Sequence, residues 1–189
     1  MKNGMTKRAL FALIAFVACA SALSAQEFKA SDKWNAFDDK GNGGSSVINK
    51  ASEFVKIDGR EVLSVTIKGN VTTKYQYGFC GVSADADPAT LKAIREGSGI
   101  KFLASGDGKK YRVKVETSDI TDFNMFGKEF TAPKGKPVEI VVPFKALTQE
   151  PWGIKKKFDP AKIVKVSFQT IGQPIASYEL TIVDLKVVP

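Results

Sequence analysis

The chain has 189 residues with a formal net charge of +8, from 28 Lys and Arg against 20 Asp and Glu, and it contains no histidine. The absence of histidine removes the commonest general base, a usual zinc ligand and every Ser-His or Cys-His nucleophile system. The excess of lysine is modest and not clustered, which is typical of a solvated surface and does not indicate nucleic-acid binding.

Residues 1–25 have the features of a secretory signal peptide. Lys2, Lys7 and Arg8 form a basic start, an apolar run of about ten residues follows at 9–18, and small residues come after it. A run of that length is too short for a membrane-spanning helix. We therefore expect an exported protein, periplasmic or in the cell envelope, whose net charge falls by three when the leader is cleaved.

Cys19 leaves a second interpretation of the leader open. The segment Phe16-Val17-Ala18-Cys19 resembles a relaxed bacterial lipobox, and lipidation of Cys19 would tether the domain to a membrane. Otherwise Cys19 is a small apolar residue inside the leader. After cleavage Cys80 is the remaining cysteine, so no intramolecular disulfide can form, and Cys80 is expected to be a buried small hydrophobe.

The remaining residues, 26–189, are predicted to form a single all-β domain. Period-two alternation of apolar residues, which marks half-buried strands, recurs in 61–68, 75–82, 99–105, 110–117, 138–142, 164–168 and 178–188. One short surface helix interrupts the strands, with Asp87 as its cap, Pro88 at its first position and Gly97 at its end. Roughly eight or nine strands joined by polar turns indicate an antiparallel β-sandwich.

Residues 99–117 carry the clearest pattern in the chain. Two runs of apolar residues alternate there, Ile100, Phe102 and Ala104 in the first and Tyr111, Val113 and Val115 in the second. Between the runs, Gly106 and Gly108 suit the positive φ angles of a tight turn. The pattern predicts a β-hairpin whose second strand turns its apolar residues toward the core and Arg112, Lys114 and Glu116 the other way.

The order of several short motifs resembles two related groups of proteins. A Gly-Gly-Ser-Ser loop at 43–46 follows Trp34, an F-x-x-x-G-D-G-K-x-Y segment spans 102–111, a strand at 138–144 ends in Val-Pro-Phe, and 178–185 forms the closing strand. This order resembles the complex I intermediate-associated protein 30 family and the family 11 carbohydrate-binding modules, over 34–187. The resemblance implies a jelly-roll β-sandwich of the galactose-binding-like type.

The resemblance also implies a non-catalytic domain that binds a carbohydrate or a protein. An enzyme is not expected, because the sequence shows no second pair of carboxylates placed across a cleft for glycoside hydrolysis. Two alternatives are a structural component of a cell-envelope or periplasmic flagellar sheath assembly, and an assembly chaperone. The expected partner is a glycan or an envelope protein, with membrane contact only through a lipidated Cys19.

Sugar-binding sites combine flat aromatic rings with a few placed polar groups. The candidate ligand-binding residues are Trp152, Phe126, Tyr77 and Tyr75, and the alternative for each is a place in the core. Trp152 is the strongest candidate, because it lies between Pro151 and Gly153 in a loop.

Jelly-roll binding modules often hold a structural calcium near the start and end of the domain, through carboxylate and carbonyl oxygens. The resemblance therefore implies Asp38, Asp39 and Asp184 as candidate ligands of a structural calcium. Otherwise the adjacent carboxylates Asp38 and Asp39 form and solvate a turn. No other cofactor is expected.

Overall fold

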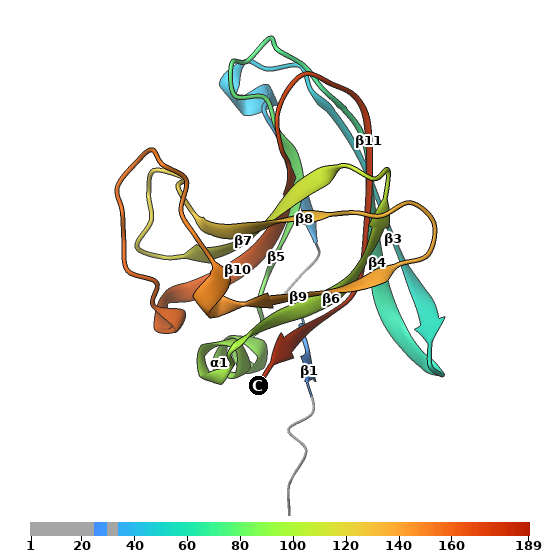
Figure 1. The fold of residues 1–189 in the computed structure, drawn as a ribbon, viewed down its shortest axis with the longest axis vertical. Helices are drawn as coiled ribbons and strands as arrows, with labels where there is room; N and C mark the ends of the chain where they lie inside the picture. The colour runs from blue at the N-terminus through green and yellow to red at the C-terminus, as the bar shows by residue number, and fades with distance from the viewer. Residues whose placement is uncertain (1–24, 30–33) are drawn as a thin grey trace, which may run out of the picture.

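The computed structural model describes residues 25–29 and 34–189, which form two antiparallel β-sheets packed face to face (Figure 1). The predicted leader up to residue 24, with Cys19, lies outside the described residues. Within them the regular structure is strand apart from helix α1 (Pro88–Glu96) and three 3-10 turns (Lys40–Asn42, Phe144–Ala146 and Pro160–Lys162). This architecture confirms the predicted all-β antiparallel sandwich with one short helix.

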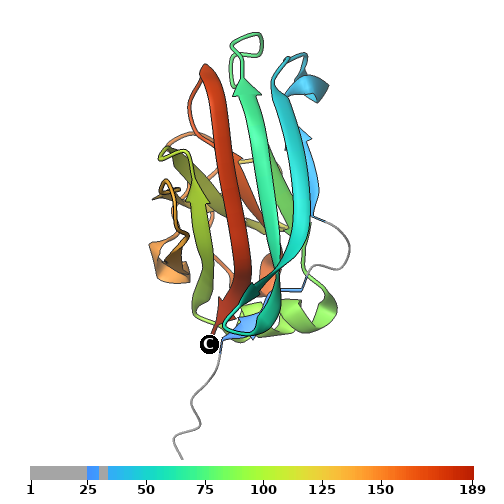
Figure 2. The same cartoon turned by 90° about the vertical axis from the view of Figure 1, so that its right-hand side faces the viewer.

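The first sheet has six strands in the order β3-β4-β11-β6-β9, with the short β1 paired to β11. Figure 2 shows β6, β11, β4 and β3 side by side, with α1 across one end. The strands are β1 (Gln26–Glu27), β3 (Val47–Ile57), β4 (Arg60–Val71), β6 (Gly99–Gly106), β9 (Val138–Pro143) and β11 (Ile175–Val188).

The second sheet has five strands in the order β2-β5-β10-β7-β8. The strands are β2 (Asn35–Asp38), β5 (Cys80–Asp85), β7 (Lys110–Thr117), β8 (Phe126–Thr131) and β10 (Ile163–Thr170). One face of this sheet packs on the first sheet, and the other face points outward.

Helix α1 begins and ends where the sequence predicts. The Asp87 side chain accepts a hydrogen bond from Thr90 N at 2.7 Å, and Pro88 occupies the first helical position, where its missing N–H costs nothing. Ile94 is buried in the core. Across residues 25–29 and 34–189, no helix is both long enough and apolar enough to cross a membrane.

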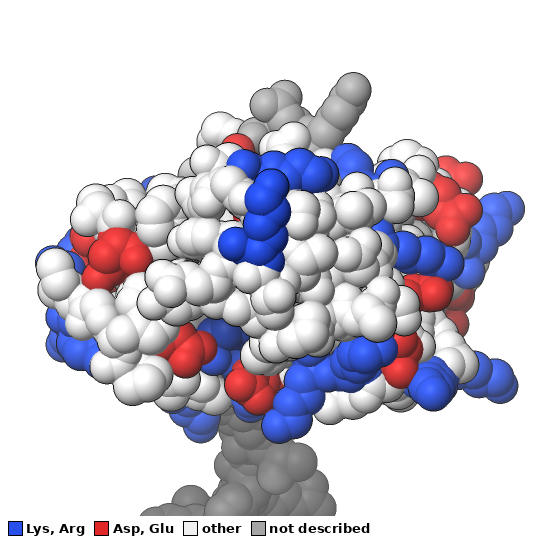
Figure 3. Space-filling model, turned by 90° about the horizontal axis from the view of Figure 1, so that it is seen from above, with Lys and Arg blue, Asp and Glu red and all other residues white. Residues whose placement is uncertain are grey.

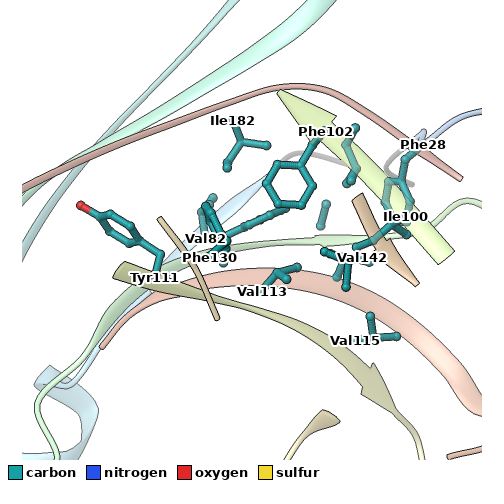
Figure 4. Packing of buried hydrophobic residues seen from close by; sticks show 14 of the residues in the cluster. Phe28, Val82, Ile100, Phe102, Tyr111, Val113, Val115, Phe130, Val142 and Ile182 are labelled. Atoms are coloured by element: carbon teal, nitrogen blue, oxygen red, sulfur yellow. The ribbon is translucent and has the colours of Figure 1, made fainter. Parts of the chain in front are cut away.

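The core lies between the sheets and consists of their inward-facing side chains (Figure 4). Phe102 of β6 packs edge-to-face on Phe168 of β10, with ring centroids 4.9 Å apart. Such aromatic pairs contribute about 0.5–1.5 kcal/mol beyond the burial of their area. Tyr111, Val113 and Val115 are buried as predicted, and so is Cys80.

The predicted hairpin is wrong in one respect, because β6 and β7 do not pair with each other. β6 pairs with β9 and β11 in the first sheet, and β7 pairs with β8 and β10 in the second. Alternation reports which face of a strand is buried, not which strand lies beside it. The turn at 107–109 therefore carries the chain from one sheet to the other.

Only one of the two glycines at this turn has the predicted conformation. Gly108 has a φ of 86°, a value that L-residues rarely adopt. Gly106 is instead needed for a close approach of β11, because a Cβ at Gly106 would lie 2.2 Å from Glu179 O.

Asp107 fixes the turn by hydrogen bonds to both sheets. Its Oδ1 accepts from Lys109 N at 3.0 Å and from Tyr111 OH at 3.1 Å, and its Oδ2 accepts from Lys109 Nζ at 2.7 Å and from Glu179 N at 3.2 Å. Burial raises the pKa of Asp107, but these hydrogen bonds outweigh it and hold the pKa below its ordinary value. Asp107 thus joins β7 to β11.

Other details differ from the sequence prediction. Strands β2, β3 and β8 were not expected, and 75–79 is loop because β5 begins at Cys80. Val164 is exposed although its alternation predicts burial. A register shift between Ile163 and Lys165 explains this, since Ile163 is buried instead.

We predict that Asp107→Asn lowers the free energy of unfolding at pH 7 by about 1–3 kcal/mol, because it removes a charged acceptor from several hydrogen bonds. The folded-state pKa of Asp107 is depressed, so its stabilisation is complete above the unfolded value of about 3.9 and is lost as the pH falls through the lower folded value. The difference from wild type should therefore shrink as the pH falls below about 4.

Urea unfolding across this pH range measures the effect. Glu53→Gln, at an exposed position on β3, is the control and should follow the wild-type curve. An Asp107→Asn deficit that is independent of pH would show that the carboxylate charge does not stabilise the turn.

Candidate functional site

The outward face of the second sheet carries polar side chains in register across its central strands. Opposite one another lie Arg112 and Gln169, Lys114 and Ser167, and Glu116 and Lys165. Ser83 of β5 lies opposite Ser167 on the other side of β10. We call this set the polar face, made up of Ser83, Arg112, Lys114, Glu116, Lys165, Ser167 and Gln169.

Hydrogen bonds hold the side chains of the polar face in place. Lys114 Nζ donates to Gln169 Oε1 at 2.8 Å, and Ser167 Oγ donates to Glu116 Oε1 at 2.6 Å. Lys165 Nζ lies 3.8 Å from Glu116 Oε2. Burial lowers the pKa of the Lys114 amine, and the charge of Glu116 opposes this shift.

Arg112 extends over Gly127 toward the edge of the sheet. Its Nη2 donates to Thr148 O at 2.7 Å, and its Nη1 lies 3.0 Å from Glu150 Oε1. A Cβ on Gly127 would lie 2.7 Å from Arg112 Nε, so the glycine makes room for the guanidinium. Arg112 Nε is buried and has no hydrogen-bond partner in the described structure.

An aromatic ring borders the polar face at the opposite edge. Phe37 of β2 pairs with Gly81 of β5, and a Cβ on Gly81 would lie 2.3 Å from the ring of Phe37. Phe79 supports it, with ring centroids 6.1 Å apart. Both rings are only half-buried, so the polar face lies between an aromatic border and the loop that carries Glu150.

That loop is fixed by the buried side chain of Asn124. Asn124 Oδ1 accepts from Glu150 N at 2.9 Å, and its Nδ2 donates to Trp152 O. Asp122 Oδ2 accepts from Ile154 N at 2.7 Å, and this bond and a second one from Asn124 N lower the pKa of Asp122. The segments 118–125 and 147–157 therefore form one cross-linked border.

The structure separates the four predicted ligand-binding residues. Trp152 is 52% exposed on the border just described. Phe126 does not have the exposed position that the sequence predicts. It is buried and packs edge-to-face on Phe158, with ring centroids 5.0 Å apart. Its polar neighbours in the sequence suggested exposure, but its position opposite Val115 turns it inward.

Tyr75 and Tyr77 lie in a loop rather than on a strand face. Their rings form an edge-to-face pair with centroids 5.8 Å apart, and Tyr77 is largely exposed. This loop bonds to Gln173, beyond the Thr170 end of β10, whereas the Trp152 loop lies near its Ile163 end. The tyrosines and Trp152 therefore do not form one site.

The three predicted calcium ligands do not converge on one site, because Asp184 lies far from the neighbouring Asp38 and Asp39. Asp39 is fully buried and both of its oxygens accept from Ser46, which in turn bonds to Thr72 just after β4, while Asp38 pairs with Lys40 at 2.8 Å. Asp184 lies at the other end of β4, where it pairs with Arg60 at 3.1 Å.

Within the part of the chain that is described, no three carboxylate, His or Cys groups cluster as metal ligands. The structure thus brings together no ligand set for calcium from Asp38, Asp39 and Asp184, and calcium binding stays a prediction of the sequence.

The polar face was only partly visible in the sequence. Arg112, Lys114 and Glu116 were expected on the outward side of their strand, but no function was assigned to them. Lys165, Ser167 and Gln169 alternate in the same way in β10. The polar residues of β7 and β10 form one surface only because the two strands pair. Alternation along a strand does not show which strand pairs with it, so the sequence could not predict this surface.

Charge on the molecule is mixed. In the view of Figure 3, Lys and Arg side chains are spread over the surface and lie beside Asp and Glu. At this end of the molecule they do not gather into one basic patch, as phosphate-backbone binding would require.

Two solved structures of a family 11 carbohydrate-binding module from Clostridium thermocellum are similar to this chain. One, from a cellulosomal cellulase, has a TM-score of 0.57 at 14% identity, and the match covers 89% of this chain and 96% of that chain. The other, in complex with a β-1,3-1,4-mixed-linked tetrasaccharide, has a TM-score of 0.56 at 14% identity and covers 89% and 97%. The fold is thus the jelly-roll β-sandwich of carbohydrate-binding modules.

Comparison of sequences identifies the family. The family model for Complex I intermediate-associated protein 30 (CIA30) matches residues 23–182, and the chain belongs to this family. Endoglucanase 3 of Fibrobacter succinogenes is 28% identical over 154 residues, which cover 76% of this chain and 22% of that enzyme. The chain therefore spans about a fifth of the length of this curated relative.

We predict that the two tryptophans respond differently to truncation. Trp34 is buried and stacks on Phe168 with centroids 5.8 Å apart, so Trp34→Ala should cost about 3–5 kcal/mol of unfolding free energy. Trp152→Ala, at an exposed loop position, should cost less than about 1 kcal/mol. Thermal melts of the two variants measure this difference, and equal losses would show that the indole of Trp152 supports the core.

Proposed function

We propose that the chain is a non-catalytic carbohydrate-binding domain and that the polar face is its binding surface. The observation that carries this proposal is the row of hydrogen-bonded charged and amide groups next to the Phe37 ring, in which Lys114, Glu116 and Gln169 are half-buried. Sugar hydroxyls need donors and acceptors at fixed positions, and the apolar face of a pyranose needs a flat ring. Groups that are already held in place lose little entropy when a ligand binds.

The relatives support this proposal without settling the ligand. The neighbour in complex with a mixed-linked tetrasaccharide shares the fold, and the CIA30 match covers most of the chain. The match to a fifth of an endoglucanase supports an accessory role beside a catalytic part rather than a catalytic role. The leader predicted at residues 1–25 supports export, and for an exported domain a glycan outside the cytoplasm is the natural partner.

A glycan array followed by calorimetry tests the proposal, with the β-1,3-1,4-mixed-linked tetrasaccharide as the first soluble probe. Gln169→Ala and Phe37→Ala should each weaken binding at least about tenfold, the loss that corresponds to one hydrogen bond or one ring contact. Lys68→Ala, at an exposed position on the first sheet, is the control and should bind as wild type.

Thermal melts confirm that each variant is folded. Two results would contradict the proposal. One is an array without any glycan signal. The other is a bound glycan whose affinity is unchanged in folded Gln169→Ala and Phe37→Ala.

A further inference from the structure

Large apolar side chains are exposed together where the segments 118–125 and 147–157 meet. Phe123 is 76% exposed, Ile154 is 64% exposed, and Trp152 belongs to the same cross-linked border. Figure 1 shows the two loops side by side, projecting from the edge of the second sheet. We call residues 122–124 and 152–157 the loop tip. Neighbouring exposed hydrophobes on a soluble domain mark an interaction surface.

Hydrogen bonds cross-link the two segments of the loop tip and hold the backbone that carries these side chains. Asp122 and Asn124 bond to the backbone of Trp152 and Ile154, as described above. Phe123 has a φ of 63°, which is unfavourable for a bulky residue. Hydrogen bonds from Asn124 N to Asp122 and from Met125 N to Phe123 O hold this backbone, so the phenyl ring is displayed to solvent in spite of the unfavourable φ.

The charge around the loop tip is positive. Lys155, Lys156 and Lys157 follow Ile154 and are all exposed. The nearby carboxylates are engaged within the protein, since Asp122 accepts two backbone N–H groups and Glu150 pairs with Arg112 at 3.0 Å. Asp119 likewise pairs with Lys162 at 2.9 Å. Lys155 Nζ also donates to Glu150 O, but a carbonyl does not neutralise the ammonium. Three lysine charges therefore lie against the single charge of Asp122 and can attract an anionic partner.

We propose that the loop tip docks on a bilayer surface that contains anionic phospholipid. Phe123 and Ile154 would enter the interface at headgroup depth, and Lys155, Lys156 and Lys157 would lie on the lipid phosphates. Aromatic and aliphatic side chains next to several lysines suit this boundary, where apolar burial and attraction to anionic lipid add. A neutral glycan would gain nothing from the lysines. This contact needs no lipid on Cys19 and does not involve the polar face.

Co-sedimentation with vesicles tests the proposal. The purified protein should bind vesicles of mixed phosphatidylglycerol and phosphatidylcholine, bind pure phosphatidylcholine at least tenfold more weakly, and lose affinity as salt rises. Ile154→Ser should weaken binding severalfold. Phe54→Ser is the matched control, because Phe54 is 72% exposed on β3, away from the loop tip.

Phe123→Gly separates docking from folding. Glycine adopts positive φ without strain, so this variant should melt at or above the wild-type temperature and yet bind vesicles more weakly. Lys156→Ala/Lys157→Ala should also bind more weakly, whereas Lys134→Ala/Lys136→Ala, which removes two exposed lysines from another loop, should not.

Three results would overturn the proposal: no binding to anionic vesicles, equal binding to neutral ones, or equal losses in the loop-tip and control variants. Gln169→Ala, which alters the polar face, should bind vesicles as wild type. The vesicle test therefore remains valid even if the proposal of glycan binding fails.

Discussion

The passage of the chain between the two sheets at residues 107–109 is the constraint on which the rest of the molecule depends. Asp107 bonds to Tyr111 and to Glu179, so β7 leaves the turn in a fixed rotation about its own axis. That rotation buries Tyr111, Val113 and Val115. It leaves Arg112, Lys114 and Glu116 on the outward side, where β10 supplies their partners. The core and the polar face are therefore two sides of one strand, and the orientation of β7 determines both.

Glycine has a second role in this arrangement, at positions that lie beneath other side chains. Gly81 lies under the Phe37 ring and Gly127 lies under the Arg112 guanidinium. A side chain at either position would displace the group above it and break the continuity of the polar face. The sheet thus lies between an aromatic border and a loop border, and its Lys114–Gln169 and Ser167–Glu116 pairs are already hydrogen-bonded.

Much of this could be predicted from local pattern, and the rest depends on tertiary pairing. The alternation of apolar residues predicts the buried faces of β7 and β11, and the capping residues Asp87, Pro88 and Gly97 predict the bounds of α1. The predicted pairing of β6 with β7 is wrong, because strands of both sheets show the same alternation of apolar and polar residues. The polar neighbours of Phe126 predict exposure, whereas its strand register buries it. Asp39 is buried with both of its oxygens bonded to Ser46, seven residues away. The burial of these side chains depends on which segments of the chain contact one another, and local composition does not predict those contacts.

The central claim, that ligand binds on the outward face of the second sheet, is tested most directly by backbone amide NMR. The labelled protein is titrated with the oligosaccharide that gives the strongest array signal. The account predicts shift changes concentrated at Ser83, Lys114, Ser167 and Gln169, with Ser64, Thr66 and Thr181 of the first sheet unchanged. Changes confined to the first sheet, or to the loop that carries Tyr77, would contradict it.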